Sequence, residues 1–434
     1  MAAAGSLQPL PVPLASPSPL PPPAGNLSKW PTEDEQCSSR GCYPRLFIIG
    51  AQKAATVSLF RALKTQCSSC GSVFPGSWAD LGQGGNQAAV KEGGNQAAVK
   101  EANVFNMAGA LWQNLLKDPK RYQELYRTEN CPTRRFVDGS PQYSRSPISA
   151  ARIPELLPSH WRPQLRFLMS IREPIARDLS WFNHRLSAKA RGVPQPEYTF
   201  CSVTNSSASF PTYAAEVHCR EQELNECLVR ARRRLAKAEA PAPRERGGQN
   251  DEDGAANATS DAGRLAEFEW CADESVWSKS EHVDLRNRPV ETPVLTWGMY
   301  LPQIRTFVRR AGVARGQLLV LSFERLVTNP HDALPRVTQF MGLPEMQDPT
   351  LLHAHPTEGE HKVQTIRCET RAKLERVYAD WNDMLFRGLH GDRQSGLAPP
   401  QEPPFDGFAF EVPCDHTEVT SQAPSPHGSV QRME

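Results

Sequence analysis

The chain has 434 residues, of which 49 are Lys or Arg and 48 are Asp or Glu, so its formal net charge is +1. A nearly neutral chain has no global basic field, which argues against duplex nucleic acid as a partner and leaves anion binding to local sites. The length would hold two average domains, but long Pro-, Gly- and Ser-rich stretches are poor core material, so we expect one catalytic domain with tails and insertions.

The domain boundaries follow from composition. Residues 1–40 are rich in proline and are expected to be disordered. Residues 41–392 should form the domain, with insertions at about 70–100 and 190–290, and residues 393–434 should be a disordered tail. No stretch reaches the ~20 apolar residues that span a bilayer, and the N-terminus lacks the basic flank and apolar core of a signal peptide. A membrane anchor is therefore not visible in this sequence.

The first informative motif is LFIIGAQKAATVSLFRAL, at residues 46–63. The unbroken apolar run Leu46–Ile49 is typical of a short strand that is buried on both faces of a parallel sheet. Gly50 permits a sharp turn, and Thr56 can cap a following helix whose free first-turn amides attract anions. Lys53 would then point at a phosphate. The Walker A pattern GxxxxGK[ST] is absent, which disfavours a nucleoside triphosphatase, and an ordinary strand-to-helix turn would also fit these residues.

The nine residues GGNQAAVKE occur twice in succession, at 84–92 and 93–101. Solenoid architectures need three or more repeats of about 20 residues or longer. We therefore interpret the duplication as a loop expansion.

Two further strands are predicted at Arg135–Asp138 and Leu165–Ile171. The second delivers Arg172 to its carboxyl end, and Pro174 suits the first turn of a helix. Along that helix Arg177, Ser180 and His184 recur at spacings of three and four residues, which places them on one face.

The loops after these strands and after Ile49 should meet at one crevice, because ligands collect beyond the carboxyl ends of strands in open α/β sheets. The alternative for Arg172 and Arg177 is a pair of solvated arginines tied to Glu173 or Asp178. A lone helical histidine such as His184 is also more often a packing or surface residue.

The C-terminal half continues the alternation of helix and strand. A helix is expected around Trp297–Arg310, a strand at Leu318–Phe323 and another helix from about His331. Trp297 and Tyr300 are interpreted as core packing residues. The whole pattern predicts an α/β fold with a central, mostly parallel sheet flanked by helices.

The eleven cysteines are scattered rather than arranged as repeated CxxC pairs. The single CSSC at Cys67–Cys70 lacks a second half for zinc, so no metal site is expected. Sequons at Asn26, Asn205 and Asn257 would suit a lumenal, oxidising compartment in which some cysteines form disulfides.

Residues 45–186 and 297–386 resemble the PAPS-dependent sulfotransferases, especially the Golgi branch that modifies heparan sulfate and related glycosaminoglycans. The resemblance implies a P-loop NTPase-like sulfotransferase fold, in which GAQKAAT matches the loop that wraps the 5′-phosphosulfate of the donor. The family's usual glycines are replaced here by Ala54 and Ala55. The donor-binding residues implied in this loop are Gly50, Ala51, Gln52, Lys53, Ala54, Ala55, Thr56 and Val57.

The segment REPIARDLS resembles the family's 3′-phosphate site, which implies that Arg172 and Ser180 bind this phosphate. KEANVF, at residues 100–105, resembles a short KE motif that carries the catalytic base, with Asn103 where histidine is common. Glu101 is preferred over Glu92 as the base because an apolar pair follows it. Which of the two acts is not decided by the sequence.

The remaining matches are VDGSPQYSRSP at residues 137–147, which resembles a segment lying against donor and acceptor, and SWFNHRL at residues 180–186. The second is most similar to the N-sulfotransferase type, in which a histidine at the position of His184 lies in the active site. CETRAKLERVYADWNDMLF, at residues 368–386, resembles the closing helix of the family. The resemblance therefore implies the catalytic residues Lys53, Glu101 and His184.

The implied activity is transfer of a sulfuryl group from PAPS to a hydroxyl of a carbohydrate, with an amine as the second choice and no metal required. The acceptor would include anionic glycans, and the family implies a glycoprotein of the Golgi lumen or secretory pathway, while a cytoplasmic location stays open. Two alternatives remain: a glycan- or nucleotide-binding pseudoenzyme, and a kinase-like phosphotransferase. The acceptor and the disulfide pairing are beyond the sequence.

Overall fold

The computed structural model describes residues 37–38, 41–66, 70–71, 103–106, 109–126, 135–192, 200–202, 210–239, 261–277, 294–314, 316–351, 363–389, 407–408 and 412–415. At its centre lies a five-stranded sheet of order β4-β5-β3-β6-β7, in which every neighbouring pair is parallel. The predicted α/β class with a parallel sheet flanked by helices is confirmed. The strands are β3 (Leu46–Gly50), β4 (Cys70–Gly71), β5 (Phe136–Asp138), β6 (Arg166–Ile171) and β7 (Leu318–Ser322).

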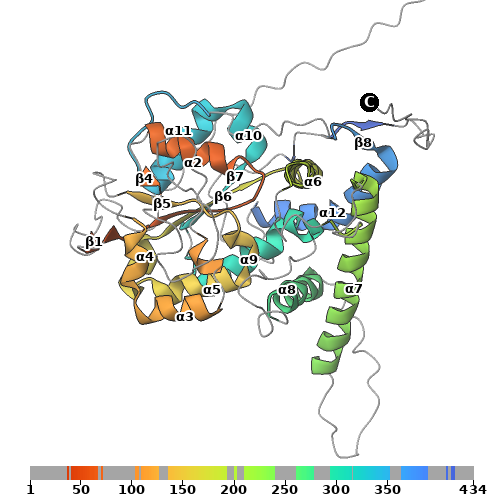
Figure 1. The fold of residues 1–434 in the computed structure, drawn as a ribbon, viewed down its shortest axis with the longest axis horizontal. Coiled ribbons are helices and arrows are strands. Elements are labelled where there is room, and N and C mark those ends of the chain that lie inside the picture. Colours follow the sequence, from red (N-terminus) through yellow and green to blue (C-terminus); the bar gives the residue numbers. More distant parts are fainter. Residues whose placement is uncertain are drawn as a thin grey trace, which may run out of the picture.

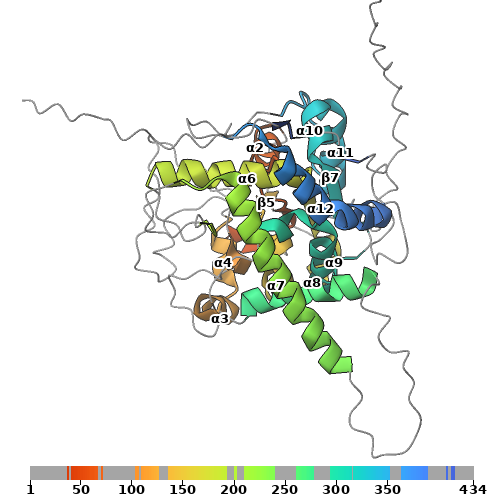
Figure 2. The ribbon, with the colours of Figure 1, turned by 90° about the vertical axis from the view of Figure 1, so that its right-hand side faces the viewer.

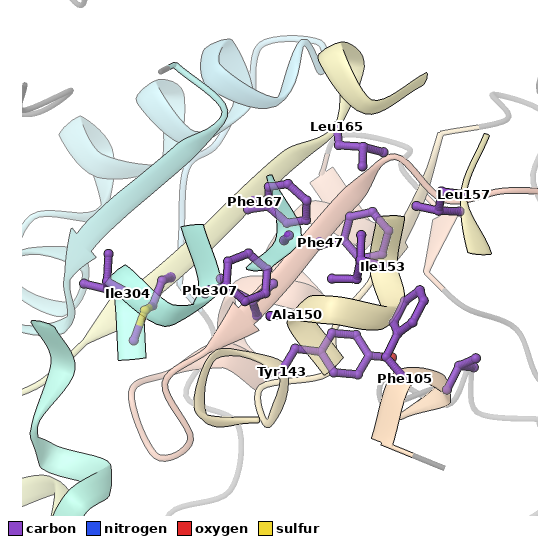
Figure 3. Close-up of a cluster of buried hydrophobic side chains, with 14 of the residues drawn as sticks. Phe47, Phe105, Tyr143, Ala150, Ile153, Leu157, Leu165, Phe167, Ile304 and Phe307 are labelled. Atoms are coloured by element: carbon purple, nitrogen blue, oxygen red, sulfur yellow. The ribbon is translucent and has the colours of Figure 1, made fainter. Parts of the chain in front are cut away.

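The central strand β3 is buried on both faces, as its unbroken apolar run predicts. Leu46 and Ile48 belong to one hydrophobic cluster, whereas Phe47 and Ile49 belong to another on the opposite face of the sheet. Figure 3 shows the second cluster, where Phe47 packs on Phe167 with ring centroids 5.4 Å apart. The two clusters attach separate helical layers to the two faces.

Figure 1 shows these layers. The cluster of Leu46 and Ile48 includes residues of α2 (Thr56–Gln66) and α11 (Pro330–Met341), with α10 (Phe323–Thr328) beside them. The opposite cluster draws on helices that lie below the sheet in this view. These are α3 (Gly109–Lys117), α4 (Lys120–Glu124), α5 (Pro147–Leu156) and α9 (Tyr300–Ala311).

A third group of helices packs beside the sheet, as Figure 2 shows. It contains α6 (Pro174–Ala190), α7 (Tyr213–Glu239) and α12 (Cys368–Leu389), whose apolar side chains share one cluster, and α8 (Asp261–Trp277), which lies against α7. The insertion expected at about 190–290 thus contributes two helices to the described structure. Within it, disulfide Cys201–Cys219 joins the segment before α7 to that helix, and disulfide Cys227–Cys271 joins α7 to α8.

Short segments at both ends of the domain differ from the sequence expectation. β1 (Cys37–Ser38), inside the predicted disordered residues 1–40, pairs antiparallel with β2 (Gly41–Cys42). β9 (Cys414–Asp415), inside the predicted tail, pairs with β8 (Ile366–Arg367). Disulfides Cys37–Cys42 and Cys368–Cys414 join these segments to the domain, which explains why composition alone misjudged them.

Helix boundaries depart from the predictions by small amounts. Thr56, expected to cap α2, is instead its first residue. The helix expected from Trp297 begins at Tyr300, because a 3₁₀ segment precedes it. The 3₁₀ segments are η2 (Val104–Asn106), η4 (Tyr143–Arg145), η5 (Ser159–Gln164) and η8 (Val294–Gly298). Among the described helices, none is long and apolar enough to cross a membrane.

Candidate functional site

The loop between β3 and α2 curls at the carboxyl end of the sheet. Lys53 and Ala55 adopt left-handed backbone conformations, with φ of 70° and 57°. The Ala51 N–H donates to the Ser170 carbonyl of β6 (2.6 Å), which holds the loop against the neighbouring strand. Ala55 accepts the first helical hydrogen bond of α2, from Leu59 N–H (2.9 Å). The amides of the first turn of α2 therefore lie at the same edge as Lys53.

Gly50 lies where the segment after β5 approaches its backbone closely. A Cβ atom added at Gly50 would lie 2.3 Å from Ser144 Oγ, which belongs to η4. The loop after β3 therefore touches the segment after β5. This contact brings together two of the three loops that the sequence places at one crevice.

The third loop, which follows β6, contacts the loop after β3 through two arginines. Arg172 Nη1 donates to the Lys53 carbonyl (3.4 Å), and Arg177 Nε donates to the Gln52 carbonyl (3.2 Å). Arg177 is only 1% exposed, so its interpretation as a solvated surface arginine is wrong. The predicted 5′-phosphate loop and the predicted 3′-phosphate arginine thus adjoin directly.

The Arg172 side chain keeps hydrogen-bonding capacity. Its guanidinium carbon lies 4.5 Å from the centroid of the Phe323 ring, and its Nε is buried without a hydrogen-bond partner among the described residues. Burial lowers the pKa of this guanidinium, and the nearby Glu324 carboxylate raises it again. A partly buried guanidinium with an unused donor suits an anionic ligand such as a phosphate.

Helix α6 presents the remaining predicted residues. The Glu173 carboxylate caps its N-terminus by accepting the N–H groups of Ile175 (2.9 Å) and Ala176 (2.5 Å). Ser180 and His184 lie further along α6 and are both partly buried. The helix therefore carries Arg177, Ser180 and His184 on successive turns that follow Arg172.

Trp181 connects the predicted lysine and histidine. Lys53 Nζ lies 5.7 Å from the centroid of the Trp181 ring, and the His184 ring lies 5.4 Å from the same ring. The indole is 2% exposed. The structure thus brings Lys53 and His184 to one aromatic side chain, which sequence reasoning missed.

A second tryptophan extends this cluster. Trp297 contacts Trp181 with ring centroids 5.2 Å apart, and the guanidinium carbons of Arg145 and Arg177 lie 3.5 and 4.7 Å from its centroid. Trp297 is buried, as its interpretation as a core residue requires, but two of its partners are cations. The only sequence signal for this arrangement was the aromatic pair in SWFNHRL. Arg145 lies in the segment VDGSPQYSRSP but was not singled out within it.

Asp138 ends β5 inside a cage of hydroxyl groups. Its carboxylate accepts hydrogen bonds from Ser140 Oγ (2.6 Å), Tyr143 Oη (3.0 Å) and Tyr122 Oη (3.3 Å), and the residue is fully buried. Burial raises the pKa of Asp138 to about 6, although these hydrogen bonds act in the opposite direction. Sequence analysis did not single out this carboxylate.

The cage also anchors the segment that follows the KE motif. Ser140 Oγ accepts the Asn103 N–H (2.9 Å), and Asn103 is held with φ of 48°. Phe105 packs against Tyr143 with centroids 5.2 Å apart, as seen in Figure 3. The predicted base Glu101 and its rival Glu92 lie outside the described residues, so their positions stay predictions.

Metal ligation has no candidate in the described part of the chain, where no group of three or more His, Cys, Asp or Glu side chains could hold an ion. The cationic residues that meet at the carboxyl edge of the sheet instead suit an anionic ligand. Those brought together are Lys53, Arg172 and Arg177, with Ser180 and His184 on the adjoining helix.

Comparison with protein-family models finds no match, and comparison with curated proteins also finds none. Among solved structures, the chain is similar to a sulfotransferase from Alicyclobacillus acidocaldarius. The TM-score is 0.37 and the identity 16%, with 79% of this chain and 94% of the other covered. A likeness this distant carries no functional argument, so the function must be argued from the site itself.

Proposed function

We propose that this protein is a sulfotransferase that moves the sulfuryl group of PAPS to a carbohydrate hydroxyl, with an amine as the second acceptor. The observation that carries the proposal is the hydrogen bond from the Arg172 guanidinium to the Lys53 carbonyl. It joins two cationic residues, Lys53 and Arg172, at one sheet edge, which supports their role in binding an anion. A nucleotide with anionic groups at the 5′ and 3′ ends of one ribose fits such a pair.

In this proposal the loop from Gly50 to Val57 holds the 5′-phosphosulfate. Its backbone amides and the start of α2 supply hydrogen-bond donors, and Lys53 supplies a positive charge. Arg172 and Ser180 hold the 3′-phosphate, for which the unused Arg172 Nε is a ready donor. Gln52 contributes its backbone to this loop, and Arg177 holds that backbone in place by donating a hydrogen bond to the Gln52 carbonyl.

The chemistry breaks the bond between sulfur and the phosphate oxygen and forms one between sulfur and the acceptor oxygen. Negative charge develops on the leaving phosphate, where the Lys53 ammonium stabilises it. The acceptor proton passes to Glu101, a step that is typically worth ~10²- to 10⁴-fold in rate. His184 and Lys53 both lie beside the Trp181 ring. In this proposal His184 contacts the acceptor.

A glycan- or nucleotide-binding pseudoenzyme is the second candidate. It is favoured by Ala55, because a residue other than glycine holds a left-handed conformation in the donor loop. A kinase-like phosphotransferase is weaker, since the loop lacks the Walker A pattern.

We further propose a location in the Golgi lumen or elsewhere in the secretory pathway. Four disulfides join described residues, and disulfides persist in oxidising compartments. An anionic glycan would be met there as an acceptor.

The donor is tested by titrating the purified protein with adenosine 3′,5′-bisphosphate and with ATP in a calorimeter. We expect the bisphosphate to bind at least about tenfold more tightly, because ATP offers nothing to the 3′-phosphate site. Preferential binding of ATP would contradict the proposal and support the phosphotransferase.

The base is tested in the same preparation with labelled PAPS and a panel of desulfated glycans. Glu101→Gln should lower transfer by ~10²-fold or more, whereas Glu92→Gln should leave it unchanged. The reverse result would assign the base to the first copy of the duplicated motif.

A further inference from the structure

The backbone of Arg172 is held by a side chain from a distant element. Tyr300, the first residue of α9, is 1% exposed. Its hydroxyl donates to the Arg172 carbonyl (2.7 Å) and accepts the Arg172 N–H (3.4 Å). One phenol therefore satisfies both polar backbone groups of the arginine that follows β6. Burial raises the pKa of this phenol, so it stays protonated and able to donate.

The next peptide is held from a third element. Glu173 N–H donates to Glu324 Oε1 (2.8 Å), and the other carboxylate oxygen of Glu324 accepts from Ser322 Oγ (2.9 Å). Glu324 lies in the first turn of α10 and is 3% exposed. The turn from β6 into α6 is therefore fixed by α9 on one side and by α10 on the other.

These anchors determine where the Arg172 side chain can point. The guanidinium is already limited by the Lys53 carbonyl and by the face of Phe323, and a planar guanidinium binds phosphate well only in a restricted orientation. Removing the Tyr300 hydroxyl would release the backbone of Arg172, and the guanidinium would then be less firmly held in that orientation. Neither anchor needs to touch the ligand for this effect.

We propose that Tyr300 and Glu324 are positioning residues that fix Arg172 and thereby set the preference for a nucleotide with a 3′-phosphate over one without it. The inference rests on the proposed function, which assigns the 3′-phosphate to Arg172. It assigns a role to two buried residues that are far from Arg172 in sequence.

The test compares two ligands that differ only in the 3′-phosphate, adenosine 3′,5′-bisphosphate and adenosine 5′-monophosphate. Their dissociation constants are measured by calorimetry, which needs no catalytic activity. Tyr300→Phe keeps the buried ring and removes the hydroxyl. We expect it to weaken bisphosphate binding about tenfold and to change monophosphate binding less than about twofold.

Tyr378→Phe is the matched control. Tyr378 is also 1% exposed, and its hydroxyl donates to the Leu295 carbonyl (3.1 Å) rather than to Arg172. Loss of this hydroxyl should affect stability in the same way as loss of the Tyr300 hydroxyl. It should leave the ratio of the two dissociation constants unchanged.

The role of Glu324 is tested by comparing two substitutions of this residue. Glu324→Gln retains an oxygen that can accept the Glu173 N–H, whereas Glu324→Ala does not. We expect Glu324→Ala to lower the preference for the bisphosphate by about tenfold and Glu324→Gln to preserve it within about threefold.

The outcomes separate this inference from the proposed function. If Arg172→Ala abolishes the preference for the bisphosphate but Tyr300→Phe and Glu324→Ala do not, the positioning role is wrong and the proposed function stands. Equal weakening of both nucleotides by Tyr300→Phe, or an equal effect of Tyr378→Phe, also overturns it. If Arg172→Ala leaves the preference intact, or the unaltered protein prefers neither nucleotide, the assignment of the 3′-phosphate site fails and the inference with it.

Discussion

At the scale of single residues, the loop between β3 and α2 concentrates unusual backbone conformation. Lys53 and Ala55 both have positive φ, whereas Ala54 between them does not. A left-handed conformation is less favourable for an L-residue by roughly 1–2 kcal/mol, and such strain often lies at functional sites. At Lys53 the left-handed conformation occurs in the residue whose carbonyl accepts a hydrogen bond from Arg172. The two alanines that replace glycines in the resembling family are thus not equivalent.

Ala55→Gly should raise the free energy of unfolding by up to about 1 kcal/mol, because glycine adopts positive φ without strain. Ala54→Gly should lower it by about 1 kcal/mol, since Ala54 is fully buried and needs no such freedom. Urea denaturation of both variants measures the two changes. A loss of stability in both would show that the loop conformation at Ala55 is unstrained.

Asp138 makes stability depend on pH. Its pKa of about 6 in the fold exceeds the ordinary 3.8, so the fold favours the protonated form. The stability that this proton brings is fully present below about pH 4 and is lost as the pH rises through 6. At ~1.36 kcal/mol per pKa unit the loss approaches about 3 kcal/mol.

Asp138→Asn mimics the protonated carboxyl at every pH. We expect the variant to gain stability relative to the unaltered protein as the pH rises from about 4 to 7. Denaturant unfolding of both proteins at several pH values measures the difference between their free energies of unfolding. The contributions of the other carboxyl groups are the same in both proteins and cancel. A difference that stays constant with pH would contradict the raised pKa of Asp138.

At the scale of elements, a buried ion pair joins α6 to α7. Arg185 Nη2 lies 2.7 Å from Glu216 Oε1, and Arg220 Nε lies 3.0 Å from the same oxygen. Burial raises the pKa of Glu216, but the two arginines outweigh it and bring the pKa to about 2. Arg185 belongs to the helix that carries Ser180 and His184, so this pair steadies the site from the insertion side.

Glu216→Ala should lower the free energy of unfolding by ~3–5 kcal/mol, because it leaves the Arg185 charge buried without its carboxylate. Glu226→Ala, on the same helix, removes an exposed pair with Arg230 and should change stability by less than about 1 kcal/mol. Thermal or denaturant unfolding near neutral pH compares them. The contribution of Glu216 is present above about pH 4.5 and is lost as the pH falls towards 2. Equal effects of the two substitutions would contradict this account.

The elements differ in how far sequence could predict them. Apolar runs located β3 and β6 to within one residue, because a strand buried on both faces has no polar alternation. The apolar run of β7 was also located to within one residue, although its residues alternate between buried and partly buried. The parallel arrangement then placed Lys53 and Arg172 at one edge. Helix α8 was missed, since its burial depends on α7, to which a disulfide between Cys227 and Cys271 joins it.

Side-chain contacts between distant segments could not be predicted. Tyr300 was interpreted as a packing residue, and it is buried, but its hydroxyl lies on Arg172, which is 128 residues away in the chain. Trp181 and Trp297 likewise meet only through the packing of α6 on η8. Helix packing angles decide such contacts, and a single sequence does not contain them.

At the scale of the whole molecule, disulfides and parallel strands serve different parts of the chain. The sheet and its two helical layers form the core from residues far apart in sequence, as Figure 1 shows. The disulfides instead secure the periphery, including Cys414 in the segment expected to be a tail. The loops that carry Lys53 and Arg172 follow β3 and β6 of this core, which is where a rigid site is expected.

The measurement that tests the central claim most directly is transfer of label from PAPS to desulfated glycans by the unaltered protein and by Lys53→Ala. Lys64→Ala, in the last turn of α2, is the matched control. We predict transfer by the unaltered protein and by Lys64→Ala, and a fall of ~10²- to 10³-fold in Lys53→Ala, because the leaving phosphate loses its positive partner. Full transfer by Lys53→Ala, or donor binding without any transfer by the unaltered protein, would contradict the account.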